Sequence, residues 1–171
     1  FTIHGGEVTF KGHSYMFYHN GKLPNGAGFH RSAAVEEFKY NPDGTIPFIP
    51  FTDNGPAPLG TLNPYERVEA ETMAHSWGLK TDRLPGKDHY VRKIDNGDWI
   101  KIAEVEFGTE GPKQVTVKTL NFKNPGTVEF YLNALADSPF ATVKVDGTQD
   151  EQTVEVRSRR PVTGKHDVYI L

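Results

Sequence analysis

Apolar and polar positions alternate through most of the second half of the chain. Val115 and Val117 alternate with polar residues, and so do Val128, Phe130 and Leu132. A period of two turns one side of each strand inward, as in antiparallel sheets that cover a core with one face. Turn-rich segments separate these stretches at a spacing typical of a β-sandwich. The predicted strands are residues 65–71, 98–105, 113–120, 126–133, 140–145, 152–156 and 165–171.

The first 51 residues predict shorter strands joined by tight turns. The candidates are residues 8–10, 14–19, 29–40 and 45–49, and the last two flank the turn sequence Asn41-Pro42-Asp43-Gly44. Four antiparallel strands within about 45 residues match one blade of a β-propeller, which needs neighbouring blades to bury its faces. The sequence contains no second copy, so we expect neighbouring blades outside it.

Turn-forming residues separate these two parts. Residues 52–62 are rich in Gly, Pro, Asn and Asp, which predicts a linker. Residues 72–97 also carry many turn formers and predict one long connection. No helical pattern interrupts the strands. The sequence therefore predicts an all-β chain with a four-stranded unit at 1–51 and a sandwich at 63–171.

Composition narrows the possible functions without choosing one. The 171 residues, 36% of them hydrophobic, can form one ordinary core and part of another. A net charge of −3 with both signs interspersed gives no sustained basic face, so we expect neither nucleic acid nor membrane as a partner. The absence of cysteine excludes disulfides and thiolate chemistry. No apolar run has the length of a membrane span.

Both ends predict that the chain is part of a longer protein. Phe1 is not an initiator methionine, and Leu171 falls within an alternating apolar stretch. We therefore expect further blades of the same chain upstream of Phe1. A further strand of the sandwich is expected after Leu171.

Several motifs resemble two known families. The first part resembles the last blade of the five-bladed propeller of glycoside hydrolase family 43, and the second resembles a family 6 carbohydrate-binding module. The order of the two is similar to that of arabinoxylan-debranching arabinofuranosidases and some xylosidases. The stretches that carry the resemblance are residues 7–20, 30–32, 40–46, 68–71, 94–100 and 164–169.

This resemblance implies a protein that removes arabinofuranosyl or xylosyl residues from arabinoxylan or xylan by inverting hydrolysis. Inverting enzymes use a general acid and a general base held far enough apart to admit water. In this family these carboxylates lie in earlier blades, so we expect this chain to be inactive alone. A bacterial protein, secreted or held in the cell envelope, is expected. The alternative is a non-catalytic carbohydrate-binding or structural β-sandwich protein.

Two residues of the first part are candidates for a sugar pocket. Arg31 matches the family's arginine on the pocket floor, where a guanidinium can hold carboxylates or hydroxyls. Its alternative is an ordinary surface ion pair. His4 matches a histidine that faces a metal ion or water on the propeller axis, although a residue near a chain end can also be frayed. Glu36 and Glu37 are adjacent, so they should point to opposite faces of a strand, which cannot build a two-carboxylate site, and we expect them to be solvated or blade-edge charges.

In the second part, Glu69 and Glu71 are two residues apart on a predicted strand, so both carboxylates would project from one face toward a hard cation. The family implies a structural calcium ion here. The alternative is a charged, solvent-facing side of an edge strand.

Aromatic side chains are the other expected sugar ligands, because sugar C–H faces stack on rings. Trp99 matches a residue that floors a cleft on the concave face in some family members; its alternative is a place in the core. Trp77, His75 and Tyr90 are further candidates. The cleft at the loop end lacks its usual aromatic residues, with Lys93 at the first position and none in residues 146–152.

Overall fold

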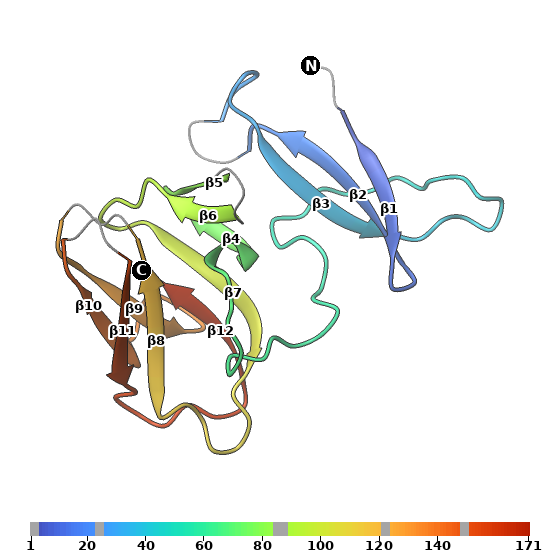
Figure 1. Cartoon of the computed structure of the whole chain (residues 1–171). Coiled ribbons are helices and arrows are strands. Elements are labelled where there is room, and N and C mark those ends of the chain that lie inside the picture. The colour runs from blue at the N-terminus through green and yellow to red at the C-terminus, as the bar shows by residue number, and fades with distance from the viewer. Residues whose placement is uncertain (1–3, 23–25, 84–88, 121–123, 148–150) are drawn as a thin grey trace. The chain divides into compact units, whose positions relative to one another are not determined.

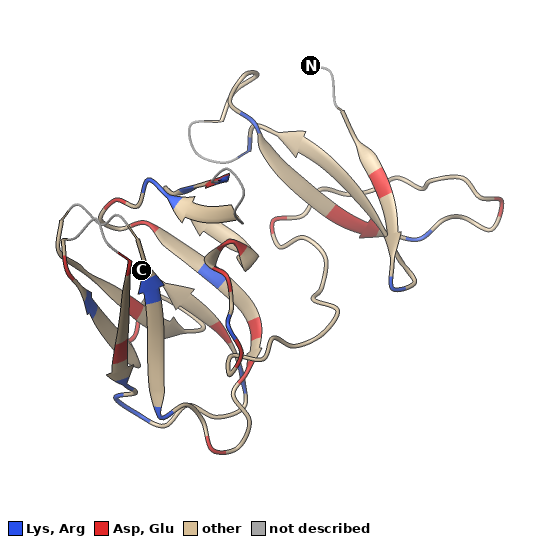
Figure 2. Ribbon diagram, in the orientation of Figure 1, with Lys and Arg blue, Asp and Glu red and all other residues tan. Residues whose placement is uncertain are grey.

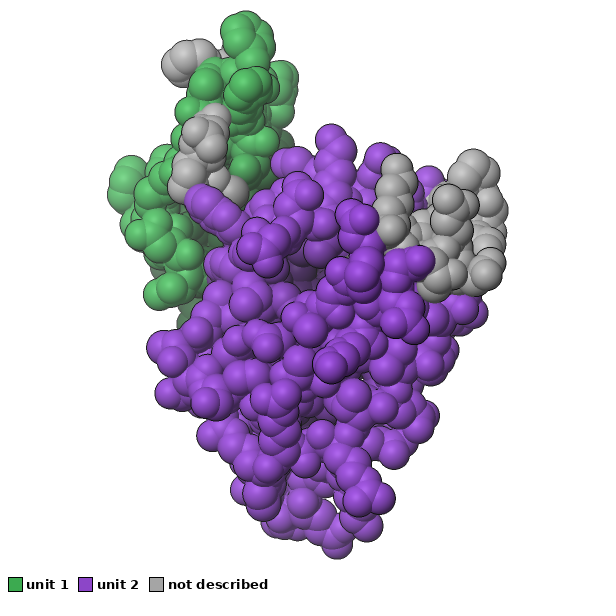
Figure 3. Space-filling view, turned by 90° about the vertical axis from the view of Figure 1, so that its left-hand side faces the viewer, with its two compact units in different colours: residues 1–57 green, residues 58–171 purple. Residues whose placement is uncertain are grey.

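The computed structural model describes residues 4–22, 26–83, 89–120, 124–147 and 151–171. They form β-strands and one three-residue 3-10 helix, η1 (Ala70–Thr72) (Figure 1). The prediction of an all-β chain is confirmed. The chain divides into two compact units, Phe1–Ala57 and Pro58–Leu171 (Figure 3). Among the described residues no helix is long and apolar enough to cross a membrane. Basic and acidic residues are interspersed along the ribbon (Figure 2).

The first unit contains one antiparallel sheet with β2 at its centre. The strand order is β1 (Gly6–Phe10), β2 (His13–Asn20) and β3 (Ser32–Phe38). Lys11 and Gly12, which join β1 to β2, both have positive φ values, of 50° and 80°. That conformation is the one that matches the twist of a two-residue hairpin.

The expected fourth strand is wrong. Residues 45–49 are described and form no strand. The Thr45 hydroxyl instead donates to Asp43 Oδ1 (2.7 Å), which closes the turn locally. Pro47 and Pro50 have no backbone N–H, so they cannot donate to a ladder. The sheet therefore has three strands in the described part of this unit.

Glu36 is buried, contrary to the expectation of a solvated charge. Its side chain is 5% exposed and accepts hydrogen bonds from the Thr52 amide (2.7 Å), the Thr52 hydroxyl (2.8 Å) and the Tyr18 hydroxyl (3.1 Å). The ring of Phe51 stacks on Tyr18 with centroids 4.7 Å apart. These contacts fix the start of segment 52–62 to the first sheet. The neighbouring Glu37 is partly exposed and bonds to His13 Nδ1 (2.7 Å).

The second unit is built on a five-stranded sheet with a two-stranded layer beside it (Figure 1). Its long strands coincide closely with those expected from alternation. The larger sheet has the order β10 (Ala141–Val145), β9 (Gly126–Leu132), β12 (Lys165–Ile170), β7 (Trp99–Glu106) and β4 (His75–Trp77). The second layer pairs β11 (Gln152–Arg157) with β8 (Gln114–Thr119).

Two expectations for residues 65–97 are wrong. Residues 65–71 form turns and the start of η1 rather than a strand. The expected connection at 72–97 contains β4 and a hairpin of β5 (Lys80–Arg83) with β6 (His89–Arg92). These strands have only three or four residues, too few for alternation to reveal them.

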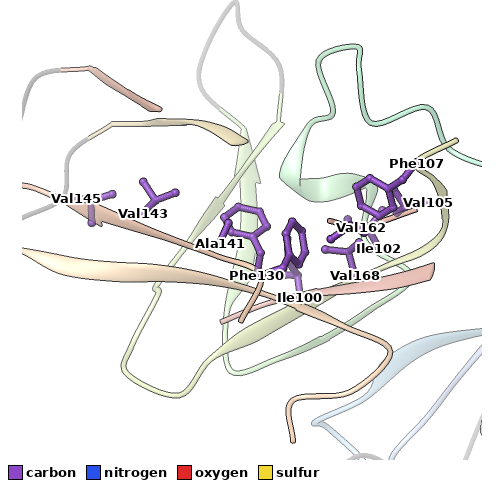
Figure 4. Packing of buried hydrophobic residues seen from close by; sticks show 11 residues of the cluster. Ile100, Ile102, Val105, Phe107, Phe130, Ala141, Val143, Val145, Val162 and Val168 are labelled. Carbon is purple, nitrogen blue, oxygen red and sulfur yellow. The ribbon is translucent and has the colours of Figure 1, made fainter. Parts of the chain in front are cut away.

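The core of the second unit lies between its two layers. The inward face of the large sheet contributes branched and aromatic side chains, shown in Figure 4. Valines at the alternating positions of β8 and β11 pack against it. The central members are Ile100, Ile102, Phe130, Phe140, Ala141, Val143 and Val168. Leu62 joins this unit through a parallel bridge to Val105, with Leu62 N donating to Glu104 O (2.9 Å).

Gly111 allows its loop to approach closely the loop that carries the core residue Val162. It has a φ of +72°, and a Cβ built on it would lie 2.0 Å from the carbonyl oxygen of Val162. Val162 is almost fully buried in the core cluster. Nearby Gly108 also has positive φ (+67°), but a Cβ there would have no neighbour within 4 Å.

We expect Gly111→Ala to destabilise the second unit far more than Gly108→Ala. An alanine held at positive φ costs roughly 1–2 kcal/mol at either site. At Gly111 the clash should add roughly 1–3 kcal/mol, as in overpacked sites. The free energies of unfolding from urea denaturation measure the difference. Equal losses in the two variants would contradict the close approach.

Candidate functional site

The outward face of the five-stranded sheet gathers the side chains best suited to bind a ligand. Directly paired residues of antiparallel strands point to the same face. Lys101 pairs with His75 on β4 and with Tyr169 on β12, and Tyr169 pairs with Tyr131 on β9. These four residues therefore form one row across four strands. We call the face that carries them the outer face.

Three aromatic rings of the outer face form what we call the aromatic platform: Trp77, Trp99 and Tyr169. Trp77 pairs directly with Trp99 across β4 and β7. The rings of Trp99 and Tyr169 lie 5.5 Å apart between centroids, with their planes inclined by 53°. Trp77 is 46% exposed, and the other two are half-buried. Trp99 thus lies on the opposite side of the sheet from the core residues Ile100 and Ile102.

A close approach of two segments fixes the edge of this platform. Gly78, directly after Trp77, has a φ of +83°, and a Cβ there would lie 1.6 Å from Asp98 Oδ1. Asp98 precedes Trp99, and its Oδ2 accepts a hydrogen bond from Asp95 N (2.9 Å). Only glycine at position 78 leaves room for the Asp98 carboxylate. The turn before β7 is thereby packed against the end of β4, beside both tryptophans.

An ion pair adjoins the aromatic platform. Lys101 Nζ lies 2.7 Å from Asp167 Oδ2 and 5.8 Å from the centroid of the Tyr169 ring. The hydrogen bond to Asp167 raises the pKa of Lys101, against the effect of burial. Burial alone would raise the pKa of Asp167, but hydrogen bonds from Lys101 and from Glu104 N outweigh it and hold this pKa below its usual value. Both groups therefore stay charged near neutral pH.

The outer face can thus offer both kinds of contact that a sugar needs. Aromatic rings stack against the apolar C–H face of a pyranose. Charged groups beside them exchange hydrogen bonds with its hydroxyls. The alternation of polar and apolar residues within 98–105 and 165–171 puts Lys101, Asp167 and Tyr169 at outward positions. The sequence therefore already indicated the face on which these residues lie. The sequence analysis named only Trp99, Trp77 and His75 of this group, without predicting that their strands pair.

In the first unit, the structure brings both predicted pocket residues to a third one, His19. Arg31 Nη1 donates a hydrogen bond to His19 Nε2, because a guanidinium can only donate. The other ring nitrogen, His19 Nδ1, faces the His4 carbonyl oxygen at 3.4 Å. The rings of His4 and His19 stack with centroids 6.1 Å apart. The sequence analysis included His19 only as the last residue of the expected strand 14–19, because nothing in its spacing indicated these contacts.

Comparison with known proteins identifies the family. The family described as "Carbohydrate binding module (family 6)" matches residues 69–171, more than half of the chain. The chain belongs to this family. A family 6 module from Clostridium cellulolyticum, solved in complex with xylose, matches 64% of this chain and 86% of that chain, with 27% identity and a TM-score of 0.59.

Longer relatives match both units. Over 98% of its own length, the chain is 33% identical to the arabinoxylan arabinofuranohydrolase of Paenibacillus polymyxa. The glycoside hydrolase family 43 arabinoxylan arabinofuranohydrolase from Bacillus subtilis, solved in complex with cellotetraose, matches the whole chain with 28% identity and a TM-score of 0.85. The chain spans 28% and 37% of these two proteins. The resemblance to both families is confirmed.

The two acidic residues predicted to bind calcium do not lie on a strand in this family 6 module. Glu69 precedes η1 and Glu71 lies within it, so the expected shared strand face is wrong. The Glu69 carboxylate pairs instead with the Arg67 guanidinium (2.6 Å). Calcium takes six to eight oxygen ligands. No three His, Asp or Glu side chains gather into a metal site within the described ranges, so these two residues alone do not fit a complete site.

The segments expected to line the loop-end cleft carry no aromatic residue where the structure describes them. Lys93 is exposed and has a φ of 53° just after β6. Residues 148–150 of the second predicted segment lie outside the described residues. The outer face, with its aromatic platform, is therefore the better candidate site.

The pH dependence of stability should reveal the Lys101–Asp167 pair. The folded-state pKa of Asp167 is lowered, so its stabilisation is present above the unfolded value, about 3.9, and is lost as pH falls through the folded value. We expect Asp167→Asn to flatten the loss of stability below about pH 4. Unfolding free energies between about pH 2.5 and pH 7 measure this. Asp137→Asn, at an exposed position, is the control. If the two variants lose unfolding free energy equally steeply at low pH, the pairing is contradicted.

Proposed function

We propose that the second unit binds a β-linked polysaccharide of the xylan or arabinoxylan class on its outer face. The observation that carries this proposal is the exposed aromatic platform beside the Lys101–Asp167 pair. Solved relatives are complexes with xylose and with cellotetraose, which support a ligand of pyranose units. Two relatives with matches to both units are named for arabinoxylan, which supports the polymer class.

The proposal extends to the longer protein from which this chain would come. We infer an exported bacterial hydrolase that removes arabinofuranosyl or xylosyl residues, with its catalytic carboxylates in upstream propeller blades. Arg31 and His4 would then lie at its sugar pocket, with His19 holding the Arg31 guanidinium in place. The exposed apolar side chains Val8, Phe10 and Phe17 of the first sheet support packing against a neighbouring blade.

We expect the complete protein to release arabinose or xylose from arabinoxylan and this chain alone to release none. Reducing-sugar analysis of the products, with the present chain as control, tests the inference. If the complete protein binds the polymer without cleaving it, the alternative of a non-catalytic carbohydrate-binding protein replaces it. If it neither binds nor cleaves, a structural role replaces both.

Calcium and a metal ion on the propeller axis stay predictions. A calcium site at Glu69 and Glu71 would require Glu69 to exchange its Arg67 partner for the ion. Thermal unfolding in calcium and in chelator tests this, because an ion bound only to the folded state raises Tm. An equal Tm in calcium and in chelator would contradict the calcium site.

Removal of one platform ring should weaken binding. We expect Trp77→Ala to lose about 1 kcal/mol of binding free energy, roughly a fivefold loss of affinity for xylohexaose, because stacked aromatic contacts have about this value. Leu120 at the end of β8 is equally exposed at 46% and lies outside the outer face, so Leu120→Ala is the matched control. Titration calorimetry compares the variants. Equal losses in both would contradict the assignment of the site.

A further inference from the structure

Asp167 lies opposite a β-bulge at the centre of the large sheet. The register of β12 on β7 shifts at this point, so that Ala103 and Glu104 together face the single residue Asp167. Glu104 has a φ of 55°, in the left-handed region that non-glycine residues rarely adopt. Such a conformation costs roughly 1–2 kcal/mol unless its surroundings hold it. The Glu104 amide donates to Asp167 Oδ1 (3.1 Å), which compensates part of this cost.

A second residue with positive φ holds Asp167 from the other side. Asn133 has a φ of 62° and donates from its amide to the Asp167 carbonyl (2.8 Å). Its side-chain Oδ1 accepts a hydrogen bond from the Asp167 amide (3.2 Å), and its Nδ2 contacts His166 Nδ1 (3.0 Å). Two residues with positive φ, Glu104 and Asn133, therefore fix the backbone and side chain of the same aspartate. Bulges and strain of this kind often aim a side chain at a functional position.

The Lys101–Asp167 pair keeps free hydrogen-bonding capacity at the platform. A carboxylate has about four acceptor positions, and Asp167 uses one for Lys101 and one for the Glu104 amide. The Lys101 ammonium has three N–H donors and gives one to Asp167. A sugar hydroxyl is both donor and acceptor, so the pair matches it in both roles.

We propose that Asp167, fixed by the bulge and paired with Lys101, makes the outer face select neutral sugars over acidic ones. This inference rests on the proposed function, because it requires a glycan on this face. Asp167 neutralises the Lys101 charge, so the carboxylate of an acidic sugar finds no uncompensated cation there. An acidic sugar on the outer face also encounters the negative charge of Glu129. The Glu129 carboxylate accepts a hydrogen bond from the Tyr131 hydroxyl (2.6 Å). Like charges at short range cost binding free energy.

The test compares two oligosaccharides of the same linkage that differ in charge. Titration calorimetry of the 171-residue chain uses xylohexaose as the neutral probe and β-1,4-linked hexaglucuronate as the acidic probe. We expect the wild type to bind the neutral probe at least roughly tenfold more tightly. Asp167→Asn leaves Lys101 without its counter-charge. The neutral-to-acidic affinity ratio should then fall by roughly tenfold or more.

Glu155→Gln is the matched control. Glu155 is exposed on β11 of the second layer, away from the outer face, and its removal leaves the Lys101–Asp167 pair intact, so we expect the affinity ratio to change by less than about threefold. Equal changes in the two variants would overturn the special role of Asp167. A wild type that binds both probes equally would overturn the selectivity while the proposed function stands. A wild type that binds neither would overturn the proposed function itself.

A measurement on the wild type covers the case in which Asp167→Asn fails to fold. Salt screens the repulsion between an acidic sugar and the acidic groups of the outer face. Between roughly 20 mM and 500 mM sodium chloride, acidic-probe affinity should therefore rise and neutral-probe affinity stay constant. Acidic-probe affinity that stays constant or falls with salt would overturn the proposal.

Discussion

The antiparallel pairing of β7 with β12 determines both the core and the candidate site of the second unit. Along β7, Ile100 and Ile102 point inward, while Trp99 and Lys101 point outward. The same alternation on β12 puts Val168 in the core and Tyr169 on the outer face. Burial of the inward side chains drives folding, and it fixes the outward ones in register as a consequence. The register of the outer-face side chains is therefore set by the core beneath them.

The β-bulge modifies this simple alternation at one place. Without it, residues beyond Ile102 on β7 would continue in the same phase, and Val105 and Phe107 would point away from the core. The extra residue restores both to the buried cluster and turns the amide of Glu104 toward Asp167. Core packing and the position of the ion pair thus have one common cause. The positive φ at Glu104 and Asn133 is the local cost of this arrangement.

Sequence reasoning predicts the long strands because each has enough alternating positions to define a period. It fails for β4, which has three residues and is held by pairing with β7. It also fails for residues 45–49, where prolines outweigh strand propensity, and for Glu36, whose burial depends on Thr52 sixteen positions away. The site was found only in part for the same reason. Trp99 and Trp77 were named from the sequence, but that their rings lie on one face together with Tyr169 becomes clear only when strand pairing is known.

Mapping of ligand contacts by NMR tests the central claim most directly. The chain contains two tryptophans, Trp77 and Trp99, so two indole N–H signals report on the aromatic platform. Titration with xylohexaose should shift both signals together with the backbone amides of Lys101 and Tyr169. Shifts confined to residues around Lys93, or no shifts at saturating ligand, would contradict the assignment of sugar binding to the outer face.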